Sequence, residues 1–246
     1  MINILHFKMN QFDYDNWTAY FAKNDAHRLN IDFSKERKLS AQEKKLIFPS
    51  IRAFQKGEGS DGYYLMKTVN EYVYKNGYSA YRDAMQWFIK DENRHSAYLK
   101  KYMDFHKVKS MKHSFLDHVF RKLRQSGGLK SEIIILVTAE MIALTYYDAL
   151  AEATESPALK SICKQMLHDE LPHIMFQSHT LSRLRLTMSD HLLRLLLMIV
   201  TSLFVWMVFH RLYRAGGYSF HHFMKDNLGY LWQSMQLSKK GKIRKQ

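Results

Sequence analysis

The motif Glu-x-x-His occurs twice in this chain of 246 residues, and the repetition constrains the fold more than any other feature. The first copy runs Glu92-Asn-Arg-His95 and the second runs Glu170-Leu-Pro-His173. Residues three apart lie on one face of a helix, so each pair can grip one metal ion. Both copies fall within apolar stripes, where a carboxylate is costly unless it is paired or bound to metal. The repetition therefore predicts two helices that each carry half of a metal site.

These inward stripes follow helical spacing. The stripe around the first copy contains Tyr81, Met85, Phe88, Leu99 and Met103. The stripe around the second contains Leu159, Cys163, Met166, Glu170, His173 and Gln177.

A single inward carboxylate lies on the segment before each motif. Glu140 lies among Ile133, Leu136, Ala143, Leu144 and Tyr147, and Glu58 lies among Ile51, Phe54 and Leu65. From Glu140 to the turn near residue 153 is about 20 Å of helix, and from Ser156 to Glu170 is about 21 Å, so the two carboxylates meet at one level in a hairpin. For Glu58 and Glu92, the lengths of helix from each residue to the intervening turn differ by about one helical turn, so these two carboxylates are less closely level.

Four carboxylates and two histidines from four helices suit a two-metal carboxylate site. Oxygen ligands with one imidazole per ion favour iron, with manganese as the other choice. The expected ligands are Glu58, Glu92, His95, Glu140, Glu170 and His173, with Glu92 and Glu170 bridging the ions. Asp91 and Asp169 are expected to accept the free N–H of the opposing helix's histidine and to orient the ring.

Long helices are expected throughout, because the chain has only 10 glycines and 3 prolines. Residues 1–39 are aromatic-rich and irregular in period, and are interpreted as a partly ordered arm that lies on the bundle. A capping box at Ser40 starts the core, and Pro49 is expected to break or kink the first segment. The main first helix, over about 50–75, should end at Gly77. Further helices are predicted over about 79–105, 111–125, 131–153 and 157–184. The fold class is thus all-α, a four-helix core at 40–185 with additional C-terminal helices at 186–246.

The C-terminal region contains an uncharged apolar stretch, Leu195 to Phe209, which is about 22 Å long as a helix and short of a bilayer span. A buried core or oligomer-contact helix is the first interpretation, which leaves a homodimer open, and a contact with the membrane surface is the second. The formal charge of +14 favours anionic partners such as acidic carrier proteins, nucleic acid or anionic lipid. A lone cysteine and the lack of a secretory signal pattern indicate a cytoplasmic protein, and a peripheral contact with the membrane stays open as an alternative.

Between residues 47 and 184 the chain resembles the ferritin-like di-iron carboxylate superfamily. Its Asp-Glu-Asn-Arg-His run and second Asp-Glu-x-x-His are similar to those of soluble acyl-carrier-protein desaturases, and it also resembles uncharacterised bacterial ferritin-like proteins. Departures are visible. The desaturase threonine one turn after the Glu140 position is replaced here by Ala143 and Leu144, with Thr145 one place further on, and Leu99 stands where a reductase has its radical tyrosine. Pro172 should kink the second metal-binding helix, and glycines around Glu58 weaken the first.

The resemblance implies an O₂-dependent di-iron oxidase or oxygenase that hydroxylates or desaturates a small or carrier-bound organic substrate with the help of an electron donor. The alternatives are a ferroxidase, peroxide-scavenging or metal-handling protein, and a tRNA-modifying di-iron hydroxylase. A third alternative is a non-catalytic, membrane-associated module.

Overall fold

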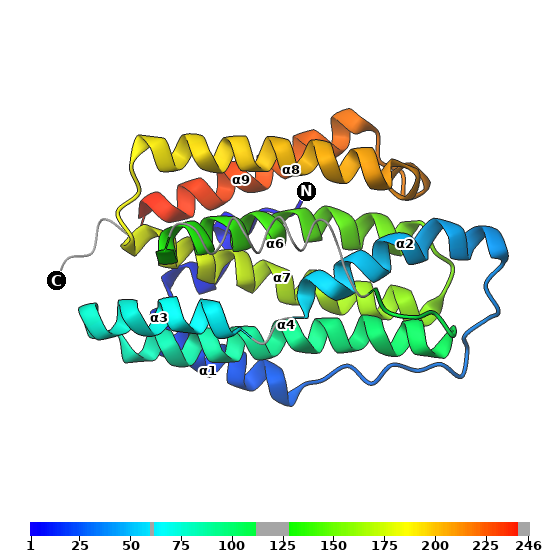
Figure 1. The fold of residues 1–246 in the computed structure, drawn as a ribbon, viewed down its shortest axis with the longest axis horizontal. Coiled ribbons are helices and arrows are strands. Elements are labelled where there is room, and N and C mark those ends of the chain that lie inside the picture. Colours follow the sequence, from blue (N-terminus) through cyan, green and yellow to red (C-terminus); the bar gives the residue numbers. More distant parts are fainter. Residues whose placement is uncertain (60–61, 112–127, 241–246) are drawn as a thin grey trace. The chain divides into compact units, whose positions relative to one another are not determined.

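The computed structural model describes residues 1–59, 62–111 and 128–240, and these residues form helices without a strand among them. The elements in chain order are η1 (Ile4–His6), η2 (Lys8–Gln11), α1 (Tyr14–Ala26), α2 (Ala41–Glu58), α3 (Tyr63–Asn76), α4 (Ser79–Phe105), α6 (Gly128–Glu152), α7 (Pro157–Arg183), α8 (Met188–Ala215) and α9 (Phe220–Lys240) (Figure 1). The all-α prediction is confirmed. The helix expected at 111–125 falls, beyond its first residue, outside the described residues.

The described chain divides into two compact units. One comprises residues 1–11, 133–155 and 163–246, and the other comprises residues 12–132 and 156–162. The boundary passes through α6 and α7, so each of these helices contributes residues to both units. The predicted three-part segmentation at 40 and 185 stays a prediction.

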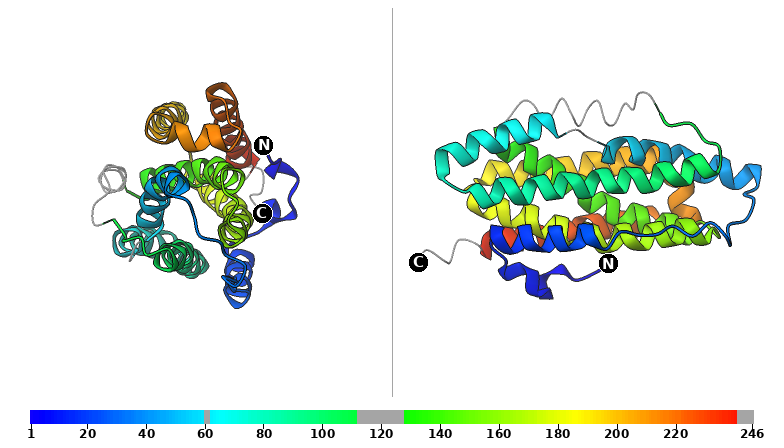
Figure 2. Two further views of the ribbon diagram at one scale, coloured as in Figure 1. Left: turned by 90° about the vertical axis from the view of Figure 1, so that its right-hand side faces the viewer. Right: turned by 90° about the horizontal axis from the view of Figure 1, so that it is seen from below.

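In the second of these units, α4 lies at the centre and contacts α1, α2 and α3. Figure 2 shows α3 and α4 running side by side, joined by a short turn. Within the region predicted to be a partly ordered arm, α1 is a regular helix that packs on α4. A capping box starts α1 at Asp13, and the buried rings of Trp17 and Phe21 follow at helical spacing, with Phe21 6.4 Å from Phe88.

The first core segment ends differently from the prediction. The capping box at Ser40 is confirmed, but α2 continues through Pro49, where Ser50 Oγ donates to Ile47 O at 2.8 Å. Helix α2 ends at Glu58, and α3 begins at Tyr63 after a left-handed Gly62 with φ +66°. Gly62 accepts this positive φ, which favours glycine, whereas Pro49 lies within a continuous helix. The predicted left-handed stop at Gly77 is confirmed.

In the unit that contains both termini, residues 1–11 and helices α6 to α9 form a second core. Helices α8 and α9 lie side by side (Figure 1). Hydrogen bonds tie α9 to its neighbours: Thr145 Oγ1 donates to Asn227 Oδ1 at 3.1 Å, and the hydroxyls of Ser178 and Ser234 lie 2.6 Å apart. Ile4 N donates to Gln233 Oε1 at 2.7 Å and fixes the N-terminal segment on α9.

The start of α7 follows its sequence signals. Ser156 Oγ accepts the N–H of Leu159 at 3.0 Å, and Pro157 occupies the first helical position, where its missing N–H costs nothing. Pro172 is accommodated inside a helix that continues to Arg183. The prediction of a helix over 157–184 is thus confirmed almost to the residue.

Two helices, α6 and α8, are long and apolar enough to cross a membrane by length and composition alone. They differ in burial: 89% of the apolar window of α6 is buried, against 33% for α8. Helix α6 is therefore a core helix of a folded bundle, whereas much of α8 faces outward. The expectation that residues 195–209 are buried in a core holds only for the inner face of α8.

Candidate metal centre

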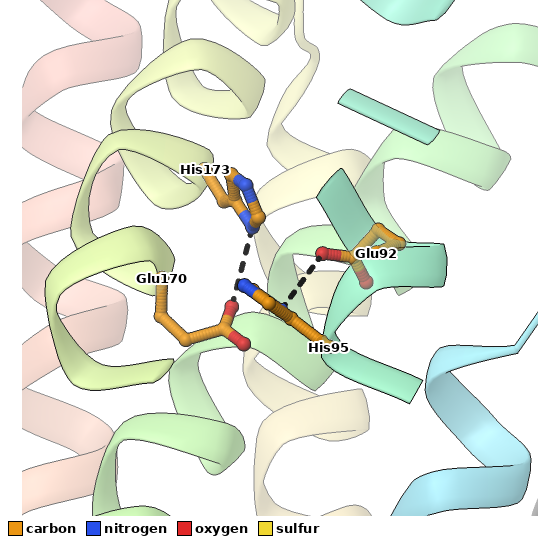
Figure 3. A group of neighbouring side chains, drawn as sticks. All are labelled: Glu92, His95, Glu170 and His173. Carbon is orange, nitrogen blue, oxygen red and sulfur yellow. Dashed lines mark ion pairs between the residues drawn. The ribbon is translucent and has the colours of Figure 1, made fainter. Parts of the chain in front are cut away.

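Helix α4 carries the first half of the predicted site. His95 is fully buried and its Nδ1 lies 3.6 Å from Glu92 Oε1, while the Glu92 side chain retains 15% exposure. Figure 3 shows both side chains on the same face of the helix, as the three-residue spacing requires. The stripe predicted for this helix is confirmed, because Tyr81, Met85, Phe88, Leu99 and Met103 are all buried.

Asp91, next to Glu92, is held by a network from α1 and α4. Arg94 forms an ion pair with Asp91, and Asn24 Nδ2 donates to Asp91 Oδ2 at 3.0 Å. Arg94 also reaches Asp25 at 3.4 Å. A carboxylate oxygen of Asp91 lies within 4.8 Å of a ring nitrogen of His95, one turn further along the same helix. From the sequence, Asp91 is expected to accept a hydrogen bond from the histidine of the opposing helix, and this hydrogen bond stays a prediction.

Helices α6 and α7 carry the second half. His173 Nδ1 lies 3.5 Å from Glu170 Oε2 and 3.7 Å from Glu140 Oε2. Glu170 and His173 are fully buried and Glu140 is 3% exposed. Figure 3 draws the Glu170–His173 pair on α7. Two carboxylates and one imidazole thus converge inside this unit, and the hairpin places Glu140 level with the motif as the sequence predicted.

The inward stripe of α7 is confirmed along its whole length. Its six members, Leu159, Cys163, Met166, Glu170, His173 and Gln177, are all fully buried. Burial raises the pKa of the Cys163 thiol far above its usual value, so this cysteine stays protonated and inert in the folded chain. Asp169, also buried, accepts hydrogen bonds from Gln165 Nε2 at 2.9 and 3.0 Å and lies 3.0 Å from His168 Nδ1.

Glu58 is the last residue of α2 and is partly exposed. The same end of α2 lies against α4, because Gln55 Nε2 donates to Ser96 Oγ at 3.0 Å and Ser96 Oγ donates to Gln55 O at 2.9 Å. Ser96 directly follows His95, so Glu58 lies at the level of the first motif. The one-turn mismatch arose from counting 58–75 as a single helix, whereas the chain breaks after Glu58. The role of Glu58 as a ligand stays a prediction.

Two polar residues near the site answer questions that the sequence left open. Thr145 Oγ1 donates to Ile142 O and to Asn227 Oδ1 on α9, so this threonine joins helices in the core. Gln177, one turn after His173, is fully buried, and neither its Oε1 nor its Nε2 has a hydrogen-bond partner within the described residues. The helical spacing placed Gln177 on the inward stripe of α7, but the sequence did not show that its amide would lack a hydrogen-bond partner.

Comparison with known proteins identifies the fold. No family model matches the chain, and no curated protein matches it. A solved structure does: a mutant of an R2-like ligand-binding oxidase with an anaerobically reconstituted Mn/Fe cofactor, with a TM-score of 0.66 and 14% sequence identity, covering 94% of each chain. The chain therefore has the ferritin-like, all-helical fold of that oxidase over nearly its full length.

Proposed function

We propose that this chain is an O₂-dependent oxidase with a two-metal carboxylate centre of iron, or of manganese and iron. The proposed ligands are Glu58, Glu92, His95, Glu140, Glu170 and His173. The observation that carries the proposal is the convergence of buried carboxylates and a buried imidazole at Glu140, Glu170 and His173. Buried charges of one sign require compensation, and a divalent cation supplies it.

The second half-site supports the same centre. On α4 the carboxylate of Glu92 lies 3.6 Å from the ring nitrogen of His95, and on α7 the carboxylate of Glu170 lies 3.5 Å from that of His173. The donor set contains hard oxygen atoms and one imidazole per half, without a thiolate, which suits Fe(II) and Mn(II). The similar solved structure, an oxidase with a Mn/Fe cofactor, supports this choice of metals.

In the proposed mechanism the protein positions the ligands and excludes water. Glu58, Glu92, Glu140 and Glu170 would hold the two ions, and His95 and His173 would complete the set of ligands. When bound, the metals supply O₂ reduction and oxidation of an organic substrate. The apolar stripes of α4 and α7 keep the surroundings dry, which strengthens every charge interaction there.

The buried aspartates complete this arrangement. Asp91 and Asp169 directly precede the glutamates of the two motifs, and both are buried. A carboxylate that accepts an imidazole N–H fixes the tautomer of a ligating histidine and raises its basicity. Asn24 and Arg94 hold Asp91 in place for this task.

Metal content after anaerobic loading with Fe(II), alone or with Mn(II), tests the proposal. We expect about two metal ions per chain and a transient visible absorption on exposure to O₂. Glu140→Ala should lower the metal content and abolish the absorption. Glu152→Ala, an exposed glutamate on the same helix, is the matched control and should behave as the wild type. Equal metal binding by all three proteins would refute the site.

The same experiment separates the oxidase from a metal-handling protein. An oxidase should consume O₂ once per loaded centre until reductant and substrate are supplied. Continued oxidation of added Fe(II), well beyond the ions that the centre holds, would instead identify a ferroxidase. The charge of +14 supports docking of an acidic carrier protein that bears the substrate. Salt-sensitive binding of tRNA in place of an acyl carrier protein would favour the tRNA-hydroxylase alternative.

A further inference from the structure

The outer face of α8 is apolar over most of its length. Its exposed positions between residues 192 and 208 are leucine, valine and methionine, at 39–66% exposure: Leu192, Leu193, Leu195, Leu196, Val200, Leu203, Met207 and Val208. This face extends for about 25 Å along the helix. Contiguous exposed apolar patches of this kind mark interaction sites in folded proteins.

The polar residues of α8 between positions 192 and 208 point the other way. Arg194 and Ser202 are fully buried and Thr201 is 7% exposed. Arg194 Nη2 donates to Ser234 Oγ at 2.7 Å and Nη1 donates to Ser238 Oγ at 3.3 Å, both on α9. The inner face of α8 also buries Met198, Val205, Phe209 and Leu212, so the helix is apolar on both faces, unlike a helix whose outer face meets water.

Exposed arginines flank this face at both ends. Arg183 and Arg185 lie just before α8, and Arg211 and Arg214 lie in its last turns. The acidic residue at the start of α8, Asp190, is engaged in the capping box with Thr187. The chain as a whole carries a formal charge of +14. An apolar strip between two cationic ends is therefore exposed on a strongly basic protein.

This charge pattern distinguishes between two occupants of the face. In a two-fold pair of chains that meet along α8, the arginines at the ends would face arginines of the second copy, and like charges in contact weaken such an interface. Anionic lipid headgroups would neutralise the arginines at both ends while the acyl region buries the leucines. The charges of α8 therefore complement an anionic bilayer and oppose a second copy.

We infer that α8 docks the protein on an anionic membrane surface, with the helix in the plane of the interface. Because the inner face of α8 is hydrogen-bonded to α9, only the outer face is available to lipid, which favours lying in the surface over crossing it. Both pairs of arginines then lie at headgroup level. This inference is independent of the proposed metal chemistry, since none of the proposed ligands lies on α8.

Vesicle flotation of the full-length protein tests the inference. The vesicles are phosphatidylcholine alone, or phosphatidylcholine and phosphatidylglycerol in equal parts. Wild-type protein should float with the mixed vesicles and bind the neutral ones much more weakly. The double variant Leu196→Glu/Leu203→Glu should bind mixed vesicles at least about tenfold more weakly, because both glutamates would enter the interface. Arg211→Gln/Arg214→Gln should reduce the dependence on phosphatidylglycerol.

A control variant and one further measurement decide the remaining outcomes. Tyr64→Glu/Tyr74→Glu adds the same two charges at exposed positions of α3 and should bind as the wild type. Circular dichroism checks that each variant is folded. Flotation of Leu196→Glu/Leu203→Glu like the wild type would overturn the inference. A wild-type dimer in sedimentation that binds no vesicle and becomes a monomer in this variant would show that a second copy covers the face.

Discussion

Replacing Gly216 by alanine tests how closely α8 approaches α6. Gly216 follows the last residue of α8 and has an ordinary φ of −84°, so backbone strain does not explain a glycine there. A Cβ at this position would lie 2.2 Å from the backbone O of Ala149 and 2.7 Å from its Cα. Since neither backbone can yield as a flexible side chain would, the two helix segments must separate.

The magnitude follows from this contact. Overpacking a tight site costs about 1–3 kcal/mol, and a clash with backbone belongs at the upper end, so we expect Gly216→Ala to lower stability by about 3 kcal/mol. For a chain of this size that corresponds to a fall in Tm of about 6–12 °C. Two further glycine-to-alanine substitutions serve as controls for the stability change at Gly216. Gly217→Ala meets open space but keeps a left-handed φ of +83°, and should cost about 1–2 kcal/mol. Gly57→Ala meets open space within α2 and should gain about 0.5–1 kcal/mol.

Thermal unfolding followed by far-ultraviolet circular dichroism measures all three variants. The expected order, from the highest Tm to the lowest, is Gly57→Ala, wild type, Gly217→Ala and Gly216→Ala. A Gly216→Ala variant as stable as the wild type would refute the close approach of α8 and α6. If Gly57→Ala lowered Tm as much as Gly216→Ala does, steric crowding at Gly216 would not explain the destabilisation.

Three further predictions follow from buried groups. Burial lowers the pKa of His106 below its usual 6.5; the charge of Glu36 opposes this shift and that of Lys44 reinforces it. As the pH falls, His106 is therefore protonated in the unfolded chain before it is protonated in the folded chain. The free energy of unfolding should therefore fall as pH drops through 6.5, and urea titrations at acidic and neutral pH should show that His106→Gln lacks this slope. Ser156→Ala removes the cap of α7 and should lower the unfolding free energy by about 1–2 kcal/mol in the same titration, whereas Ser156→Thr, which retains the hydroxyl, should lose less. The Cys163 thiol should react with a thiol reagent only after unfolding in urea, and fast labelling of the native protein would contradict its burial.

Local signals predicted much of the fold correctly. The helix over 79–105 was predicted with both ends correct, and Ser40, Gly77 and Ser156 each act as the start or stop that their residue type favours. Caps and left-handed stops depend on hydrogen bonds and backbone angles within a few residues, so a sequence contains the information that decides them. The helical spacing of Glu-x-x-His likewise determines that each pair shares one helix face.

Contacts between distant residues were decided only by the tertiary structure. The sequence indicated an arm that lies on the bundle but not which helix the arm contacts. Helix α1 buries Trp17 and Phe21 against α4, and no local pattern encodes that partner. Thr145 could have faced a metal or a neighbouring helix, and the choice depends on Asn227, 82 residues away.

For the candidate centre, the sequence by itself determined which helices carry the glutamate–histidine pairs and that Glu140 lies level with the second pair. Only the tertiary structure decided that Glu140 comes within 3.7 Å of His173 and that α1 supplies Asn24 to hold Asp91. It also decided that the apolar stretch of α8 faces outward while Arg194 faces in. The physical reason is that periodicity identifies the two faces of a helix, whereas packing against other elements decides which face is buried.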